Sequence, residues 1–373
     1  MNNSLIKISS GYFRENMQIE SKIYILINDN YVLLCDGGIL EPKIYQKMKS
    51  LTANGEPLYV SPEYYDKVVH RKRQKVDFQT SYQVPKISLI SEAKKAAVIE
   101  FADIKNNVDD VLSYAKENEK IEIHKTREIG DRLYKNLKTI DTSLIIQCIN
   151  EIRTDDEKLF THSTNVSLLN GIMAKWLNLN QADTNLLIDV GLLHDLGKLK
   201  VPDEIMNKPG RLTKEEFEIV MHHPVDSYEM LKNSGVTDYR LLYAVRGHHE
   251  KANGTGYPDK LTLSQIPLFA KITAISDIYD AMVSKRSYKK SLSPFVVLAE
   301  FGREKFANLD IHLVNTFLSK MPLELIGKKM LMSNGEIGTV IYVDTQNLEY
   351  PMVNINGQTV QTTPALKCIE IYE

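Results

Sequence analysis

The stretch LLHDLGK, residues 192–198, is the feature that most restricts how this chain can fold. It places His194 and Asp195 among leucines, so we expect the pair to face the interior of a helical domain. Burying an ionisable pair is costly unless the pair is hydrogen-bonded, ion-paired or bound to a cation. The stretch therefore predicts a polar site in the interior of a helical domain.

Further candidate ligands lie in separate segments of the same region. Six of the nine histidines fall between residues 162 and 249, and an acidic residue follows in the segment AISDIYDAM. A single helical histidine is more often an ordinary core or surface residue than a ligand, but this set joins several apolar helices. Imidazole and carboxylate groups without thiolate suit divalent iron, manganese or zinc. The set exceeds what one open site can use, which favours two ions. The candidates are His162, His194, His222, His223, His248 and His249, together with Asp195 and Asp277.

The segments around this region predict a multidomain chain, because 373 residues exceed one ordinary core. Residues 1–103 contain β-rich runs with a hairpin turn at Asn28-Asp29-Asn30, and we expect an α/β or mostly β regulatory module. Residues 104–152 are expected to form a helical linker. Its apolar face carries Ile129, Leu133, Leu137 and Ile140.

The second half of the chain changes character once more. Residues 153–322 read as a mainly helical domain, with a capping box formed by Thr213 and Glu216. Residues 323–373 contain short β-rich segments and the hairpin dipeptide Asn356-Gly357, which predicts a small C-terminal β extension.

Charge and composition limit the partners and the compartment. A formal net charge of -2 argues against nucleic-acid binding, and the basic run HRKRQK at residues 70–75 is expected to be a solvated loop. Cys35, Cys148 and Cys368 form no disulfide framework, which favours a reducing compartment. The sequence shows neither a signal peptide nor an apolar run of about 18 residues, so we expect a cytoplasmic protein without a membrane span.

Taken together and in order, the motifs resemble the HD-GYP domain of the HD phosphohydrolase superfamily. FTHSTNV, HDLGK, HHP, HHE, GTGYP and SDIYDAM carry this resemblance, over nearly half the chain. It implies that residues 153–322 form an all-helical HD-type catalytic core with a binuclear, sometimes trinuclear, non-haem metal centre. Members of this family hydrolyse the bacterial second messenger cyclic di-GMP to pGpG, and some continue to GMP.

The resemblance also implies individual roles. Carried over by motif, seven candidate ligands are implied: His162, His194, Asp195, His223, His248, His249 and Asp277. Asp195 would bridge the two ions that share a hydroxide nucleophile. His223 matches a ligand better than His222, which we expect to support a ligand or to lie at the surface. Asp280 could hold a ligand or water, or be an ordinary helical acid. Lys198 would lie near the scissile phosphate, with Asp195 the second catalytic residue. The expected substrate-contacting residues are Lys198, Gly256, Tyr257, Pro258, Asp280, Arg286 and Lys289.

Three positions depart from the family pattern. Lys158 stands where members with three metals carry Glu, and Glu157 is one position away, which argues for two ions, expected to be Fe or Mn. Asn253 and Ser287 replace a common Asp and Pro, but neither change removes a ligand. We therefore expect an active cyclic di-GMP phosphodiesterase.

Two alternatives stay open. The first is a phosphodiesterase of another cyclic dinucleotide such as cyclic GMP-AMP. The second is a catalytically silent nucleotide sensor whose Gly-Tyr-Pro loop contacts a partner such as a diguanylate cyclase domain. A homodimer is also left open.

Overall fold

The computed structural model describes residues 6–8, 13, 17–27, 30–53, 58–61, 64, 87–151, 158–208, 210–283, 293–303 and 308–372. The chain divides into two compact units, Met1–Lys86 and Ile87–Glu373. Several sequence-based expectations concern residues outside the described ranges: the basic run at 70–75, the turn residues Asn28 and Asp29, Glu157, and the substrate candidates Arg286 and Lys289.

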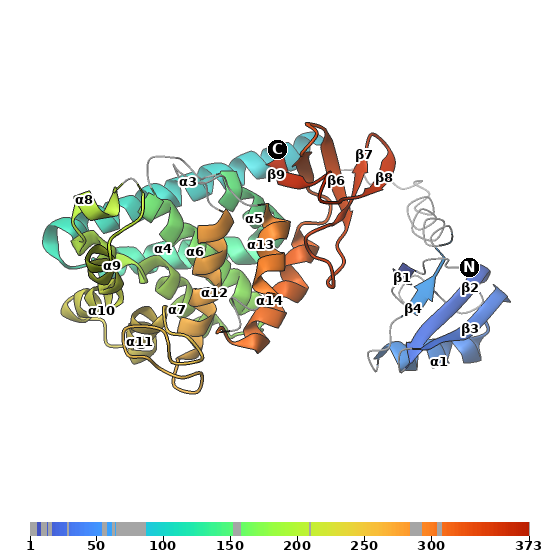
Figure 1. Cartoon of the computed structure of the whole chain (residues 1–373), viewed down its shortest axis with the longest axis horizontal. Helices are drawn as coiled ribbons and strands as arrows, with labels where there is room; N and C mark the ends of the chain where they lie inside the picture. Colours follow the sequence, from blue (N-terminus) through green and yellow to red (C-terminus); the bar gives the residue numbers. More distant parts are fainter. Residues whose placement is uncertain are drawn as a thin grey trace. The chain divides into compact units, whose positions relative to one another are not determined.

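The first unit is a small antiparallel sheet with one helix packed against it (Figure 1). The strand order is β1-β4-β2-β3, and β2 and β3 pair up to Ile27 opposite Asn30, as the predicted hairpin requires. Buried Ile19, Ile23 and Met48 belong to its own hydrophobic core. The elements are β1 (Ile6–Ile8), β2 (Gln18–Ile27), β3 (Asn30–Ile39), α1 (Pro42–Ala53) and β4 (Leu58–Val60).

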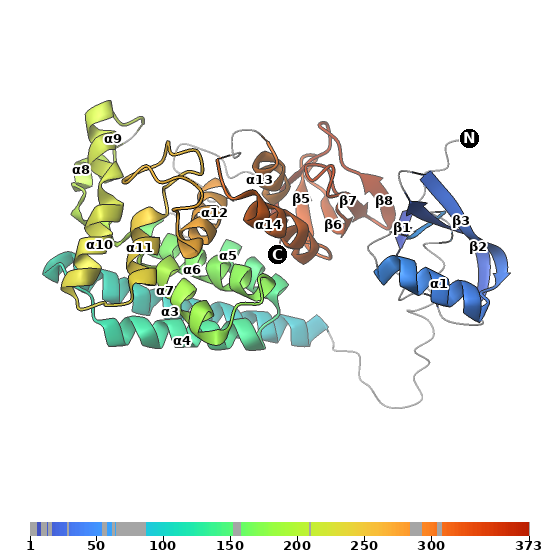
Figure 2. The same ribbon diagram turned by 90° about the horizontal axis from the view of Figure 1, so that it is seen from below.

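The second unit is built mainly of helices, which confirms the predicted all-helical core. Its long first helix, α3, lies beside α4 along one side of this unit (Figure 2). The helices are α3 (Ile87–Asn118), α4 (Ile123–Thr139), α5 (Thr142–Glu151), α6 (Lys158–Trp176), α7 (Gln181–Leu193), η2 (Leu196–Lys200), α8 (Asp203–Met206), α9 (Lys214–Met221), α10 (His223–Asn233), α11 (Tyr239–Gly247), α12 (Leu268–Val283), α13 (Pro294–Phe301) and α14 (Ile311–Glu324).

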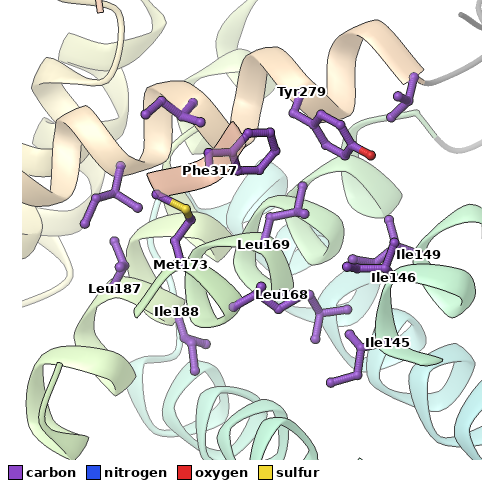
Figure 3. Close-up of a cluster of buried hydrophobic side chains, with 14 of the residues drawn as sticks. Ile145, Ile146, Ile149, Leu168, Leu169, Met173, Leu187, Ile188, Tyr279 and Phe317 are labelled. Carbon is purple, nitrogen blue, oxygen red and sulfur yellow. The ribbon is translucent and has the colours of Figure 1, made fainter. Parts of the chain in front are cut away.

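The close contact of α6 and α7 sets the geometry of the interior. Leu168 and Leu169 from α6, Ile188 from α7 and Phe317 from α14 gather in one buried cluster (Figure 3). A Cβ atom on Gly191 would lie 2.5 Å from the Cα of Ser167, so the absence of a side chain allows the two helices to approach. Since α6 carries one candidate ligand and α7 ends at another, this contact fixes their separation.

Helices α3 to α5 pack within the same unit as the helices that follow them, although a linker was expected at 104–152. Ile129, Leu133 and Leu137 are buried, as the apolar stripe predicted. Helix α4 packs on α7 and α6, while α3 contacts α4, α5, α6 and η2. The capping box of Thr213 and Glu216 at the start of α9 is present as expected.

A five-stranded antiparallel sheet completes this unit, in the order β8-β7-β6-β5-β9. Asn356 and Gly357 connect β7 to β8 with φ angles of 51° and 87°, which confirms the predicted hairpin turn. Buried Met330 and Val353 join the hydrophobic core of the helices. Within the described ranges, no helix is both long enough and apolar enough to cross a membrane. The strands are β5 (Lys329–Met332), β6 (Ile337–Tyr342), β7 (Met352–Ile355), β8 (Gln358–Gln361) and β9 (Cys368–Tyr372).

Candidate metal centre

The structure brings the seven candidate ligands to one place from five helices or helix ends. Six of them fall into two groups, within each of which the potential ligand atoms lie within 4.8 Å of one another, and Asp195 belongs to both groups. His162 and His194 complete the first group; the second contains His223, His248 and His249. Asp277, from α12, lies 3.0 Å from His162 and 4.0 Å from His249. The two groups thus meet at one carboxylate.

Asp195 is surrounded by imidazole nitrogens. Its Oδ2 lies 3.4 Å from His194 Nε2 and 3.6 Å from His162 Nε2. Its Oδ1 lies 3.1 Å from His223 Nε2 and 3.8 Å from His248 Nε2. Only 1% of Asp195 is exposed, so each carboxylate oxygen can interact with its own pair of histidines out of contact with solvent.

A hydrogen bond at Nδ1 orients four of these rings. His194, His223 and His248 each bond to the backbone carbonyl three residues earlier, at distances of 2.8, 2.7 and 2.6 Å. His162 Nδ1 instead bonds to Asp280 Oδ2 at 2.8 Å. Because an imidazole that donates through Nδ1–H keeps its lone pair on Nε2, the lone pairs of His194, His223 and His248 point toward Asp195.

Burial and charge favour the cation-binding forms of His248, His249 and Asp195, and a positive charge at His162. Burial lowers the pKa of His248 far below its usual value and that of His249 to about 3, so both imidazoles are neutral at pH 7. Burial would raise the pKa of Asp195, but the neighbouring His194 and Lys198 lower it. Burial would lower the pKa of His162, yet hydrogen bonds to Asp277 and Asp280 raise it to about 10. Positive charge is thus favoured among these carboxylates.

Two orphaned atoms and one close pair of nitrogens fit a bound cation. Within the described part of the chain, the buried atoms His194 Nε2 and Asp195 Oδ1 have no hydrogen-bond partner. Nε2 of His223 lies 3.3 Å from Nε2 of His248, so two lone pairs face each other when both rings donate through Nδ1. Such an arrangement is unfavourable without a shared positive charge. A cluster of imidazoles and carboxylates is the donor set that divalent iron, manganese or zinc accepts.

Lys198 extends from η2 to the same carboxylate. Its Nζ donates to Asp195 Oδ2 at 2.5 Å, and its side chain keeps 21% of its surface exposed. The ammonium group therefore lies between the buried cluster and solvent. Gly197, next to it, donates its N–H to Ser227 Oγ at 2.7 Å, and Ser227 Oγ donates to the His194 carbonyl at 3.0 Å. Ser227 thereby holds η2 against α10.

The Gly-Tyr-Pro loop packs against the end of α11. The Tyr257 ring lies 4.8 Å from the His249 ring, and burial raises the pKa of its phenol well above the usual value. A Cβ atom on Gly256 would collide with the backbone of Glu250, so only glycine permits this approach. Pro258 follows, and Glu250 accepts from the backbone N–H groups of Asp259 and Leu261, at 2.6 and 2.9 Å.

The structure resolves two alternatives left open by the sequence, at Asp280 and at His222. Asp280 accepts from His162 at 2.8 Å and from Asn165 Nδ2 at 3.0 Å, so it orients a candidate ligand. The side chain of His222 is 62% exposed and lies 2.9 Å from Asp226, whereas His223 is buried beside Asp195. His222 is therefore at the surface.

Sequence reasoning missed three supporting residues: Asn165, Ser227 and Glu250. Asn165 lies three residues after His162, on the same helix face, which could have identified it. Glu250 directly follows the two histidines, in the quoted HHE motif. No comparable signal marks Ser227, because its hydroxyl bridges segments 30 and 33 residues away in the chain.

Comparisons with known proteins match the region that carries the candidate ligands. Residues 147–306 match the family model described as HD domain. The chain is 30% identical over 267 residues to "Cyclic di-GMP phosphodiesterase PA4108" of Pseudomonas aeruginosa, covering 72% of this chain and 61% of that protein. It is also 30% identical over 190 residues to "3'3'-cGAMP-specific phosphodiesterase 2" of Vibrio cholerae, covering 50% of this chain and 36% of that protein.

One solved structure shares the fold over most of the chain. The HDG"Y"P protein Bd1817 from Bdellovibrio bacteriovorus superposes with a TM-score of 0.50 at 18% sequence identity, covering 84% of this chain and 98% of that one. The chain spans 61% and 36% of the length of the two curated relatives above.

Proposed function

We propose that this chain, which carries an HD domain over residues 147–306, is a metal-dependent phosphodiesterase that hydrolyses cyclic di-GMP to pGpG. One observation carries the proposal: two groups of candidate ligands share the buried carboxylate of Asp195. A shared carboxylate is what a pair of adjacent cations requires. The proposed ligands are His162, His194, Asp195, His223, His248, His249 and Asp277.

Hydrolysis of a phosphodiester needs a nucleophile at neutral pH and compensation of the charge on phosphate. Two divalent ions held here would supply both, by lowering the pKa of a shared water and by binding phosphate oxygens. Lys198 would face the non-bridging oxygens from the solvent side, because its ammonium group lies at the edge of the buried cluster. Tyr257 and the neighbouring Gly256 and Pro258 would form one wall of the entrance.

The donor set favours Fe or Mn over metals that select thiolate. Cys148 and Cys368 are buried elsewhere in the hydrophobic core of this unit, and neither belongs to the two ligand groups. Two ions per chain are expected because each group offers at least two imidazoles beside the shared carboxylate.

The substrate has two candidates among cyclic dinucleotides. Cyclic di-GMP leads, in line with the relative from Pseudomonas aeruginosa, and cyclic GMP-AMP is second because another relative is specific for it. Both substrates would present one phosphate to the ligand cluster and the second further out. From the sequence we assign that second phosphate or a guanine to Arg286 and Lys289.

A combined metal and turnover assay tests the function. Purified chain should contain about two Fe or Mn ions by elemental analysis and should convert cyclic di-GMP to pGpG faster than it cleaves cyclic GMP-AMP. Faster cleavage of cyclic GMP-AMP would reverse the substrate assignment. Metal binding without turnover of either nucleotide would favour the silent sensor, and absence of metal and activity after Fe or Mn addition would refute the metal centre.

A second assay isolates the substrate contact. Arg286→Ala should raise the KM for cyclic di-GMP while leaving hydrolysis of a nitrophenyl phosphodiester nearly unchanged, because the synthetic diester lacks a second phosphate. Equal losses on both substrates would mean that Arg286 serves the metal centre or the fold instead.

A further inference from the structure

A cavity lies between α4, α7 and the segment that joins α10 to α11. It has a volume of about 370 Å³, within the size range of small-molecule sites. Its apolar lining includes Ile121, Leu186, Leu193 and Val236. None of the seven proposed metal ligands lines it. The cavity is therefore separate from the site assigned to hydrolysis.

The polar lining of this cavity is rich in hydrogen-bond acceptors. Asn185 and Asp189 stand four residues apart on α7, so their side chains share one face of the helix. Asn185 Oδ1 is buried and has no hydrogen-bond partner within the described ranges, while its Nδ2 donates to Asp131 at 3.2 Å. An acceptor without a donor in a buried position is costly, so the Asn185 oxygen calls for a donor.

The packing of α4 against α7 explains how a carboxylate reaches this position. A Cβ atom on Gly130 would lie 2.5 Å from Asp189 Oδ1, so the carboxylate occupies the space that a side chain on α4 would fill. Burial raises the pKa of Asp189 to about 7, although the nearby charge of Arg127 opposes this. A cationic partner in the cavity would remove that penalty.

The arginines of the lining do not convert it into an anion site. Arg240 already pairs with Asp183 at 2.7 Å and with Asp238 at 2.9 Å. That leaves Arg127 facing two carboxylates, Asp131 and Asp189, and the unpaired oxygen of Asn185. The balance favours donors and positive charge in the ligand.

We propose that this cavity binds a small organic amine, with its ammonium group against Asp189 and Asn185 and its apolar body against Leu186, Leu193 and Val236. The inference goes beyond the proposed hydrolysis and does not depend on it. The ligand would contact α7 within its last two turns, the helix whose C-cap is His194.

Three matched probes test the charge requirement in the full chain at pH 8. By isothermal titration calorimetry, 2-phenylethylamine should bind at least tenfold more tightly than neutral 2-phenylethanol or anionic 3-phenylpropionate. Methyl NMR signals of Ile121, Leu186 and Leu193 should shift with the amine. Equal affinity for the three probes, no measurable amine binding, or shifts confined to other methyl groups would overturn the proposal.

A pair of variants tests the carboxylate. Asp189→Asn should weaken amine binding at least tenfold and leave the weak binding of 2-phenylethanol unchanged. Asp110→Asn, at an exposed position on α3, should bind the amine as the unaltered chain does. A thermal melt shows that each variant is folded. Unaltered amine affinity in folded Asp189→Asn would refute the site.

Discussion

At the scale of single residues, neighbours rather than residue type separate the candidate ligands from ordinary side chains. His222 and His223 are adjacent, yet one is exposed beside Asp226 and the other is buried 3.1 Å from Asp195. The two histidines lie where α9 ends and α10 begins, and their rings point in different directions there. The sequence motif alone favoured His223, and the burial of its ring supplies the physical reason.

His223→Ala should therefore lose metal and activity, whereas His222→Ala should keep both. Removing the buried ring leaves Asp195 Oδ1 without its nearest imidazole, while removing the exposed ring changes only a surface pair. Metal content per chain and turnover of cyclic di-GMP are measured for both variants. The opposite pattern, with metal lost from His222→Ala alone, would contradict the assignment.

Lys198→Ala should keep its metal but lose about 10²-fold in kcat, the usual cost of removing one positioned group that stabilises transition-state charge. Lys200→Ala is the matched control, because Lys200 lies on η2 as well but pairs with Glu119 at 3.1 Å. The control should retain its full rate. Equal rates for both metal-loaded variants would assign Lys198 a structural role.

Asp189 gives a prediction for the pH dependence of stability. Its pKa in the folded chain is about 7, above the ordinary value of 3.8, so the folded state holds the proton more tightly than the unfolded state. Its contribution to stability is full below about pH 4 and is lost as the pH rises through about 7. Asp189→Asn should then raise the melting temperature more at pH 8 than at pH 5, and Asp110→Asn should not. A pH-independent difference would exclude this titration.

At the scale of elements, local patterns predicted helices and turns more securely than the contacts between them. The hairpin at Asn356 and the capping box at Thr213 were readable because a few adjacent residues determine each. The hydrogen bonds of Ser227 and Glu250 could not be predicted from the sequence, because each joins segments whose proximity depends on tertiary packing. The motifs therefore identified the candidate ligands but not the hydrogen bonds that orient them.

Glu250 provides a test at this scale, because one carboxylate holds two backbone N–H groups of the Gly-Tyr-Pro loop. Only 4% of Glu250 is exposed, and Gln can accept through one oxygen alone, so one of the two N–H groups loses its acceptor. Glu250→Gln should keep its metal and raise the KM for cyclic di-GMP more than it lowers kcat.

The matched control is Glu218→Gln on α9, whose side chain is 63% exposed. It should leave KM and kcat unchanged. Metal loss in Glu250→Gln would show that Glu250 positions His249 rather than the loop. Unchanged KM would show that the ion pair of Arg246 with Asp259, at 2.6 Å, holds the loop without it.

At the scale of the whole molecule, an amphipathic pattern shows that a face is buried but not what covers it. The stripe on α4 was read correctly as apolar, yet the sequence could not show that it packs on α7 and α6. For this reason a linker was expected where the structure has part of the helical core. The described residues before Lys86 form one hydrophobic core and those after it form another. These separate cores explain why the chain divides into two compact units.

These separate cores predict the outcome of two truncations. A chain of residues 87–373 should melt as a folded helical unit and bind metal, because its core draws none of the described residues of the first unit. A chain of residues 153–373 should not fold, since it lacks the fully buried side chains of Phe101, Leu133 and Ile145 from α3, α4 and α5. Losing even one such side chain typically costs about 2–5 kcal/mol, a large part of the stability of a domain. Circular dichroism melts and metal content distinguish the two chains, and a folded, metal-binding 153–373 would show that α3 to α5 are the linker that the sequence suggested.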